Sequence, residues 1–201
     1  MSARADTRVG PDDMNEIVRA ALEETIALHQ RVKDADAQPI VNAAAAIVEA
    51  LKRGGTLLMF GNGGSASDAQ HMAAELVGRF QRERRALAAI ALTADTSVVT
   101  AIANDEAFDR VFTRQIEAVG RSGDVAFGVS TSGASANVVA ALQAARARGL
   151  QTIALTGRDG GAAGRAAAIH INVPSHVTAR VQEVHRTILH IICDLVERAF
   201  T

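Results

Sequence analysis

Apolar residues recur along this chain with two different periods, which predict helices near both ends and an alternation of strands and helices between them. Residues 13–32 and 39–52 carry apolar side chains at helical spacing, and Gly54-Gly55 ends the second of these helices. Short, continuously apolar runs follow, which are typical of strands buried on both faces. The chain closes with a long apolar helix over residues 178–200.

Each expected strand between residues 56 and 173 is separated from the next by a helix or a glycine-rich turn. The expected strands are residues 56–60, 87–92, 124–129, 151–155 and 169–173. The expected helices between them are residues 66–80, 105–119 and 136–148. This order implies an α/β fold with a parallel sheet, in which ligands bind outside the carboxyl ends of the strands. We expect one domain over residues 13–201, preceded by a flexible stretch at residues 1–12.

The turn after the third expected strand carries four hydroxyl groups and a glycine. It reads Ser130-Thr131-Ser132-Gly133-Ala134-Ser135, and a helix is expected from Ala136. Free backbone N–H groups and the positive end of the helix dipole favour an anion at such a turn. Because the loop holds neither Lys nor Arg, it suits a phosphate monoester better than a polyphosphate with its metal. A Ser/Thr-rich helix cap without a ligand is the alternative.

The turn after the first expected strand is rich in glycine and reads Gly61-Asn62-Gly63-Gly64-Ser65. Its glycines let backbone amides approach a ligand, and Ser65 is a good cap for the next helix. No Gly-Lys-Ser/Thr follows, which excludes a Walker loop. The spacing fits a loose dinucleotide fingerprint, but the second strand ends in Leu92-Thr93, with no acidic residue to hold a ribose. A tight turn without a ligand is the alternative.

Two helices carry polar side chains suited to metal or proton chemistry. His71 and Glu75 lie about 40° apart around one helix, where they can chelate a divalent metal, act as acid and base, or form an ordinary surface pair. The terminal helix places Gln182, His185 and His190 among apolar residues. Burying each of them costs on the order of one to several kcal/mol unless it has a partner. Core histidines with hydrogen-bond partners are therefore the alternative to ligands.

Composition narrows the class of function. The chain has 201 residues, of which 48% are hydrophobic and 21% charged, a balance typical of a globular domain. A net charge of −1, scattered basic residues and the lack of Trp and Tyr argue against direct binding of nucleic acid. The single cysteine, Cys193, excludes an intramolecular disulfide, and we expect it in the core. We expect no membrane span and a cytoplasmic location. We expect the charged run Arg82-Glu83-Arg84-Arg85 to form a solvated loop.

Taken together, these segments resemble the sugar isomerase (SIS) domain and, within it, the phosphoheptose isomerase family. The matching segments follow the family's order and are residues 61–65, 68–71, 75–76, 103–105, 130–133, 155–161 and 181–185, with His190. The resemblance covers nearly the whole chain from about residue 13. It implies a five-stranded parallel sheet flanked by helices, with the N-terminal helices and the long C-terminal helix building a homotetramer. It also implies that the sites lie between subunits.

The same resemblance implies a reaction and a set of site residues. The reaction converts sedoheptulose 7-phosphate, a phosphorylated seven-carbon sugar, into D-glycero-D-manno-heptose 7-phosphate for heptose and lipopolysaccharide synthesis. The substrate would be held by Asn62, Gly63, Gly64, Ser65, Asn104, Asp105, Ser130, Thr131, Ser132, Ser135 and Gln182. Zinc would be held by His71, Glu75, Gln182 and His190. Within this set Glu75 would move the carbon-bound proton through an enediol, and His190 would move protons at the oxygens.

Three positions depart from the family pattern, and two other functions stay open. Ala134 replaces an Asn common in the phosphate loop, Ala179 stands where some members carry an acid, and Ala66-Ser67 varies a tolerant segment. One alternative is a non-catalytic tetramer of the same subfamily that binds the bacterial replication initiator protein. The presence of all four ligand positions favours the enzyme. The other alternative is a related sugar-phosphate isomerase or sensor, because the serine-rich loop fits any phosphosugar.

Overall fold

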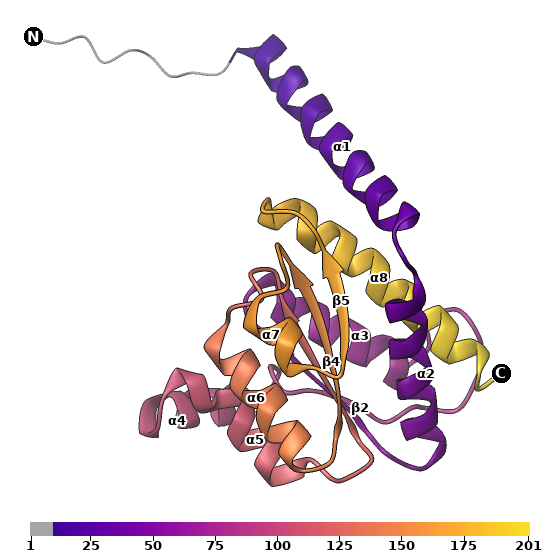
Figure 1. Ribbon diagram of the computed structural model, residues 1–201, viewed down its shortest axis with the longest axis vertical. Helices are drawn as coiled ribbons and strands as arrows, with labels where there is room; N and C mark the ends of the chain where they lie inside the picture. Colours follow the sequence, from indigo (N-terminus) through magenta and orange to yellow (C-terminus); the bar gives the residue numbers. More distant parts are fainter. Residues whose placement is uncertain (1–9) are drawn as a thin grey trace, which may run out of the picture.

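A five-stranded parallel sheet forms the centre of the computed structural model, which describes residues 10–201 (Figure 1). The strands are β1 (Leu57–Gly61), β2 (Ala89–Ala91), β3 (Val125–Ser130), β4 (Gln151–Gly157) and β5 (Ile169–Val173). Their spatial order is β2-β1-β3-β4-β5, and every neighbouring pair is parallel. The predicted α/β fold with five parallel strands is confirmed. Because the order reverses between β1 and β3, the crevice outside their carboxyl ends is where a ligand is expected.

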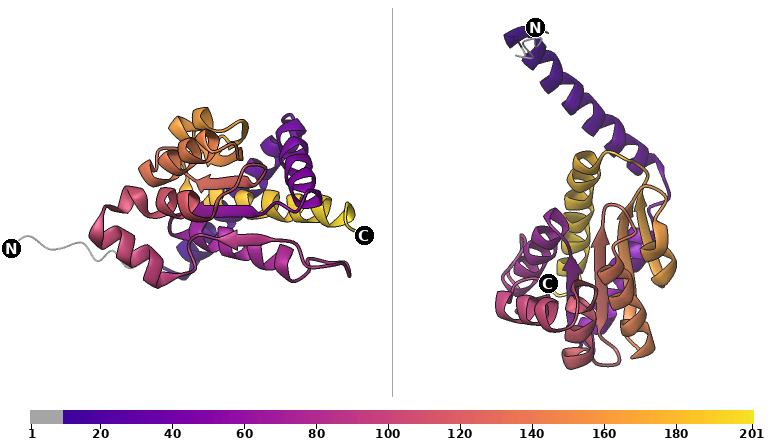
Figure 2. Two further views of the ribbon diagram at one scale, coloured as in Figure 1. Left: turned by 90° about the horizontal axis from the view of Figure 1, so that it is seen from below. Right: turned by 90° about the vertical axis from the view of Figure 1, so that its left-hand side faces the viewer.

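Helices cover both faces of the sheet, as Figure 2 shows from two sides. One face packs against α2 (Gln38–Lys52), α3 (Gly64–Val77) and α8 (Thr178–Arg198). The other packs against α5 (Val111–Val119), α6 (Ala136–Ala147) and α7 (Gly161–Ala166). Side chains of β1 alternate between the two cores: Leu57 and Met59 belong to the first, Leu58 and Phe60 to the second. This burial on both faces is the reason that the sequence of β1 is apolar throughout.

The expected helix over residues 105–119 is confirmed only over its second part, residues 111–119, and is wrong over residues 105–110. The chain instead forms α4 (Thr96–Asp105), a 3-10 turn η1 (Phe108–Arg110) and then α5. Helix α4 begins after Asp95, whose side chain accepts a hydrogen bond from the Val98 N–H at 3.0 Å. Asn104-Asp105 therefore ends a helix instead of capping one. The run Val98-Val99-Thr100 hid α4, because β-branched residues favour strands over helices.

Two further differences from the prediction involve glycine. Helix α3 begins at Gly64 with Gly63 as its N-cap, so Ser65 lies inside the helix and is not its cap. After β4, the glycine-rich turn leads into the short helix α7. Its sequence is built from alanine, glycine and one arginine. Such a segment has no apolar periodicity from which a helix could be predicted.

The first helix, α1 (Pro11–Asp34), extends away from the body of the protein (Figure 1). It starts two residues before the predicted helix, and residues 1–9 of the stretch predicted to be flexible lie outside the described residues. Among residues 12–34, Leu28 alone is buried. The last turns of α1 attach to α8, where Thr25 Oγ1 donates to Glu183 Oε2 at 2.6 Å and His29 Nε2 lies 2.9 Å from Thr187 Oγ1.

Helix α8 lies in the core and buries polar side chains together with apolar ones. The His185 side chain is fully buried, and its Nε2–H donates to the Thr156 carbonyl at 3.0 Å, which confirms a core histidine at this position. Burial lowers the pKa of His185, which keeps the ring neutral. Cys193 is buried as expected, and burial is the largest of the effects that raise its pKa to about 12. No helix within residues 10–201 has both the length and the apolar character to cross a bilayer.

Candidate active site

Helices α3 and α8 lie side by side and bring three titratable side chains together. His71 Nε2 lies 2.9 Å from His190 Nε2 and 3.2 Å from Glu75 Oε1. One ligand atom from each of the three residues lies within 4.8 Å of the others, and all three side chains are half-buried. His71 and Glu75 are one turn apart on α3, so the helix itself fixes their spacing. The structure thus groups three of the four residues expected to hold a metal.

This group has the donors and the spacing that a divalent cation such as zinc requires. With Zn–N distances of about 2.0–2.1 Å, the ligands of a tetrahedral zinc lie roughly 3.3 Å apart. The observed separations of 2.9 and 3.2 Å are close to this value. Burial, followed by the charges of His71 and Arg186, lowers the pKa of His190. The neutral imidazole is the form that binds a metal or accepts a proton.

Gln182, the fourth expected ligand, lies elsewhere in this chain. Its amide packs against Gly64 at the start of α3, where a Cβ would overlap it. Gln182 and His190 are eight residues apart on α8, a rise of about 12 Å along the helix. Gln182 lines a polar cavity of about 550 Å³ together with His29, Ser67, Asp68 and Arg186. Within one chain, the structure does not bring Gln182 to the other three residues.

The serine-rich loop forms at the N-terminus of α6, and three of its hydroxyl groups converge. Ser130 Oγ lies 3.0 Å from Ser135 Oγ and 3.4 Å from Ser132 Oγ, while Thr131 is half-buried in the same turn. Ser135 is the N-cap of α6, yet its hydroxyl makes no capping hydrogen bond to the helix. Gly133 adopts a φ of +66°, and a Cβ there would overlap the Gly160 carbonyl. This backbone contact shapes the loop.

Two asparagine side chains join the glycine-rich turn to the serine-rich loop, at the point where the strand order reverses. Asn62 Nδ2 donates to Asn137 Oδ1 at 2.9 Å, and Asn137 Nδ2 donates back to Asn62 Oδ1 at 2.9 Å. These two hydrogen bonds hold the glycine-rich turn next to the serine-rich loop. Sequence reasoning missed Asn137, although an Asn in the first turn of a helix directly after such a loop was a usable signal. Gly63 and Gly64 are exposed beside this pair.

Within residues 10–201, no side-chain hydrogen bond joins three other expected substrate residues to the serine-rich loop. Ser65 is buried, and a Cβ at Gly61 would lie only 2.9 Å from the Ser65 Cβ, so its side chain faces the protein interior. Asn104 and Asp105 are exposed at the end of α4, where Asn104 Nδ2 donates to Asp105 Oδ1 at 2.8 Å. These placements leave their contact with a substrate a prediction.

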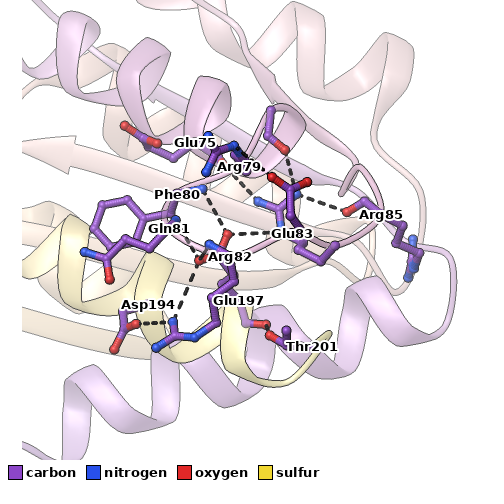
Figure 3. A network of polar contacts seen from close by, with 12 residues as sticks. Glu75, Arg79, Phe80, Gln81, Arg82, Glu83, Arg85, Asp194, Glu197 and Thr201 are labelled. Carbon is purple, nitrogen blue, oxygen red and sulfur yellow. Dashed lines mark hydrogen bonds and ion pairs between the residues drawn. The ribbon is translucent and has the colours of Figure 1, made fainter.

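The segment that follows α3 differs from the solvated loop expected there. The Arg84 side chain is buried and lies 3.5 Å from the Glu197 carboxylate, measured from Nε to Oε1. Its Nη2 donates to the Glu75 carbonyl at 2.7 Å. The Phe80 ring lies over His190, with ring centroids 5.4 Å apart. Figure 3 shows the polar contacts between Phe80, Gln81 and Arg82 of this segment and Glu197 near the end of α8. The expectation is wrong for Arg84, because Glu197, far along the chain, supplies the charge that this buried guanidinium needs, whereas Glu83 and Arg85 are exposed as expected.

Comparison with known proteins identifies the family. Residues 22–157 match the SIS domain family. The chain is 53% identical over 177 residues to the phosphoheptose isomerase of Roseiflexus sp., which covers 88% of this chain and 90% of that protein. The phosphoheptose isomerase of Citrifermentans bemidjiense is 58% identical over 159 residues, 79% of this chain and 83% of that protein. The chain belongs to the phosphoheptose isomerase family of SIS-domain proteins.

Solved structures agree with this family assignment. The phosphoheptose isomerase of Neisseria gonorrhoeae has a TM-score of 0.87 and 46% identity, covering 92% of this chain and 99% of that one. The enzyme of Francisella tularensis has a TM-score of 0.89 and 35% identity, covering 92% of this chain and 98% of that one. The predicted membership of the phosphoheptose isomerase family is confirmed.

Proposed function

We propose that this chain is a phosphoheptose isomerase, which interconverts sedoheptulose 7-phosphate and D-glycero-D-manno-heptose 7-phosphate. Family membership supports the proposal, since the relatives that carry this name share about half of their residues with it over most of their length. The observation that carries it is the convergence of His71, Glu75 and His190. The non-catalytic alternative is not favoured by these relatives. We propose a cytoplasmic setting, in keeping with a charged phosphosugar that does not cross a bilayer unaided.

The reaction needs one group that moves a carbon-bound proton and another that moves protons at the oxygens. In the ketose-to-aldose direction, the Glu75 carboxylate takes a proton from the hydroxymethyl carbon next to the carbonyl and returns it to the former carbonyl carbon. His190 exchanges a proton between the two oxygens of the enediol. The lowered pKa of His190 leaves its ring neutral, so that it can accept a proton before it donates one.

Zinc is proposed as the cofactor, held by His71, Glu75 and His190. When bound, it supplies Lewis-acid polarisation of the sugar carbonyl. Gln182 is proposed as a further ligand. Because Gln182 packs against Gly64 in this chain and lies two turns of α8 from His190, we propose that a neighbouring chain supplies this ligand. A ligand from a neighbouring chain agrees with a site built between subunits.

The substrate phosphate is proposed to lie on the serine-rich loop, held by the hydroxyl groups of Ser130, Thr131, Ser132 and Ser135. The N-terminus of α6 adds free backbone N–H groups and the positive end of its dipole. Asn62, with Gly63 and Gly64, is proposed to face the sugar. The Asn62–Asn137 pair keeps this turn beside the phosphate loop.

A homotetramer is proposed, with the surface of α1 as part of the interface. Met14, Ile17, Val18, Leu22 and Ile26 on α1 are all more than half exposed. Beside them, an apolar cavity of about 560 Å³ is lined by residues of α1, α2 and α8, Ile26, Ile40 and Ile191 among them. An apolar stripe of this length on a projecting helix is typical of a protein contact. Light scattering of the purified protein measures the subunit number, and a monomeric mass would contradict the proposal.

The substitution Glu75→Gln tests the catalytic proposal. The amide keeps the shape of the side chain but cannot take up the carbon-bound proton, so we expect turnover to fall by at least about 100-fold. The matched control is Glu83→Gln, whose carboxylate is 88% exposed and whose recorded ion pair, within residues 10–201, is with Arg79. Folding and subunit number should stay unchanged in both variants. Near-normal turnover of Glu75→Gln would contradict the role given to Glu75.

A further inference from the structure

The carboxylate of Glu197 holds the backbone of the segment that follows α3. Glu197 lies on α8 two turns after His190, and its side chain is fully buried. Its Oε1 accepts the Phe80 N–H at 2.9 Å, and its Oε2 accepts the Gln81 and Arg82 N–H groups at 2.8 Å each. Three consecutive amides therefore converge on one carboxylate (Figure 3). These three hydrogen bonds fix the backbone position of residues 80–82, which a solvent-exposed turn without such bonds would leave free to move.

Buried charge makes this attachment strong. Burial by itself raises the pKa of Glu197, but the hydrogen bonds from the three amides and the charge of Arg84 outweigh it, so that the pKa is lowered and the carboxylate stays ionised. Arg84 in turn donates to the Gly78 carbonyl at 2.8 Å and to the Glu75 carbonyl at 2.7 Å. Both carbonyls belong to the C-terminal end of α3, where a cation is favoured by the helix dipole.

The attachment reaches the site through Phe80. His190 and Glu197 are seven residues apart on α8 and so lie on the same stripe of the helix. Between them and α3, the Phe80 ring packs over the His190 ring at 5.4 Å between centroids. The Phe80 N–H donates a hydrogen bond to Glu197, and this bond fixes the position of the residue. A shift of residues 80–82 would therefore move the Phe80 ring away from His190. The same network reaches the backbone of Glu75 through Arg84.

We propose that Glu197 is a positioning residue of the isomerase site: it clamps residues 80–82 so that the Phe80 ring holds the His190 imidazole in the orientation that proton transfer needs. This inference rests on the function proposed above for His190. Glu197 and Phe80 touch neither substrate nor metal in this role. Outer residues that orient a catalytic or metal-binding histidine typically change activity by about 10- to 100-fold when they are replaced.

The test compares Phe80→Leu and Glu197→Gln with the exposed control Glu83→Gln. Phe80→Leu removes the ring and leaves the clamp, while Glu197→Gln weakens the clamp and leaves the ring. We expect both variants to lower kcat by about 10-fold or more. KM should change by less than about 2-fold, because neither Phe80 nor Glu197 contacts the substrate. We also expect the imidazole NMR signals of His190 to shift or broaden in both variants of the metal-free protein. Glu83→Gln should leave kcat and these signals unchanged.

Each outcome decides the inference. If folded Phe80→Leu keeps the kcat and the His190 signals of the parent protein, the ring does not position His190 and the inference is overturned. If Glu197→Gln loses only stability while kcat and signals persist, the clamp is purely structural, which also overturns it. Should Glu197→Gln fail to fold, Phe80→Leu alone decides. If the parent protein shows no isomerase activity, the proposed function fails, and the His190 signals still decide whether the clamp orients the ring.

Discussion

Replacing Gly133 by alanine tests the packing that shapes the serine-rich loop. The residue has a φ of +66°, a conformation that costs an L-residue about 1–2 kcal/mol. An added Cβ would also overlap the Gly160 carbonyl and lie 2.9 Å from the Gly161 nitrogen. These are backbone atoms, which cannot swing aside as a flexible side chain does, and overpacking of this kind costs about 1–3 kcal/mol. The free energy of unfolding should therefore fall by about 2–5 kcal/mol.

Gly54→Ala is the matched control. Gly54 has a φ of +83°, and no atom lies within 4 Å of the Cβ that would be added. Only the conformational cost of about 1–2 kcal/mol applies there. The difference between the two variants, about 1–3 kcal/mol, then measures the contact between the loop and the turn at residues 160–161.

Urea unfolding followed by circular dichroism, at one protein concentration, measures both losses. The Gly133 variant should also raise KM for the phosphosugar, because the hydroxyl groups of its loop move with the backbone. The Gly54 variant should leave KM unchanged. Equal losses of stability in the two variants, with an unchanged KM, would refute the reasoning that the contact with Gly160 holds the loop in shape.

Two further predictions concern buried polar groups. Asn62→Ala and Asn137→Ala should show a coupling energy of about 1–2 kcal/mol in a double-mutant cycle of unfolding free energies. Each single variant already removes both amide hydrogen bonds, so the second substitution has little more to lose. Additive losses of unfolding free energy would contradict this. Because burial lowers the pKa of His185 below the 6.5 of an unfolded chain, its contribution to stability is complete above about pH 6.5 and is lost as the pH falls below it. His185→Gln should therefore flatten the fall in unfolding free energy between about pH 7.5 and 5.5, and equal slopes in both proteins would count against this assignment.

Most of the fold could be predicted from local sequence, and the exceptions have identifiable causes. Strand β1 is buried on both faces, so its run of apolar residues was informative by itself. Helix α4 buries none of its residues and carries Val98-Val99-Thr100, so neither periodicity nor propensity indicated it. Helix α7 is built from alanine, glycine and arginine and shows no apolar face in its sequence. Local reasoning failed at these two helices because neither sequence shows an apolar pattern clear enough to predict a helix.

The candidate site was less predictable, because it depends on residues far apart in the chain. His71 and His190 are 119 positions apart, and spacing along the sequence gives no reason for them to meet. The expectation that they share a site came from the resemblance to a family. The structure explains the convergence of His71, Glu75 and His190 by the parallel packing of α3 against α8. The burial of Arg84 could not be foreseen, since it requires the carboxylate of Glu197 from the other end of the chain. Gln182 was expected to share a metal ion with His190, but within one chain it lies at Gly64.

Solvent-deuterium incorporation tests the central claim most directly. The protein is incubated in D2O with sedoheptulose 7-phosphate, and the sugar is followed by NMR, with added zinc and with a chelator. The account predicts deuterium at the hydroxymethyl carbon next to the carbonyl together with aldose formation, both lost in Glu75→Gln, and weakened by the chelator if zinc is the cofactor. No exchange in either condition, with the protein folded and at its native subunit number, would contradict the isomerase function.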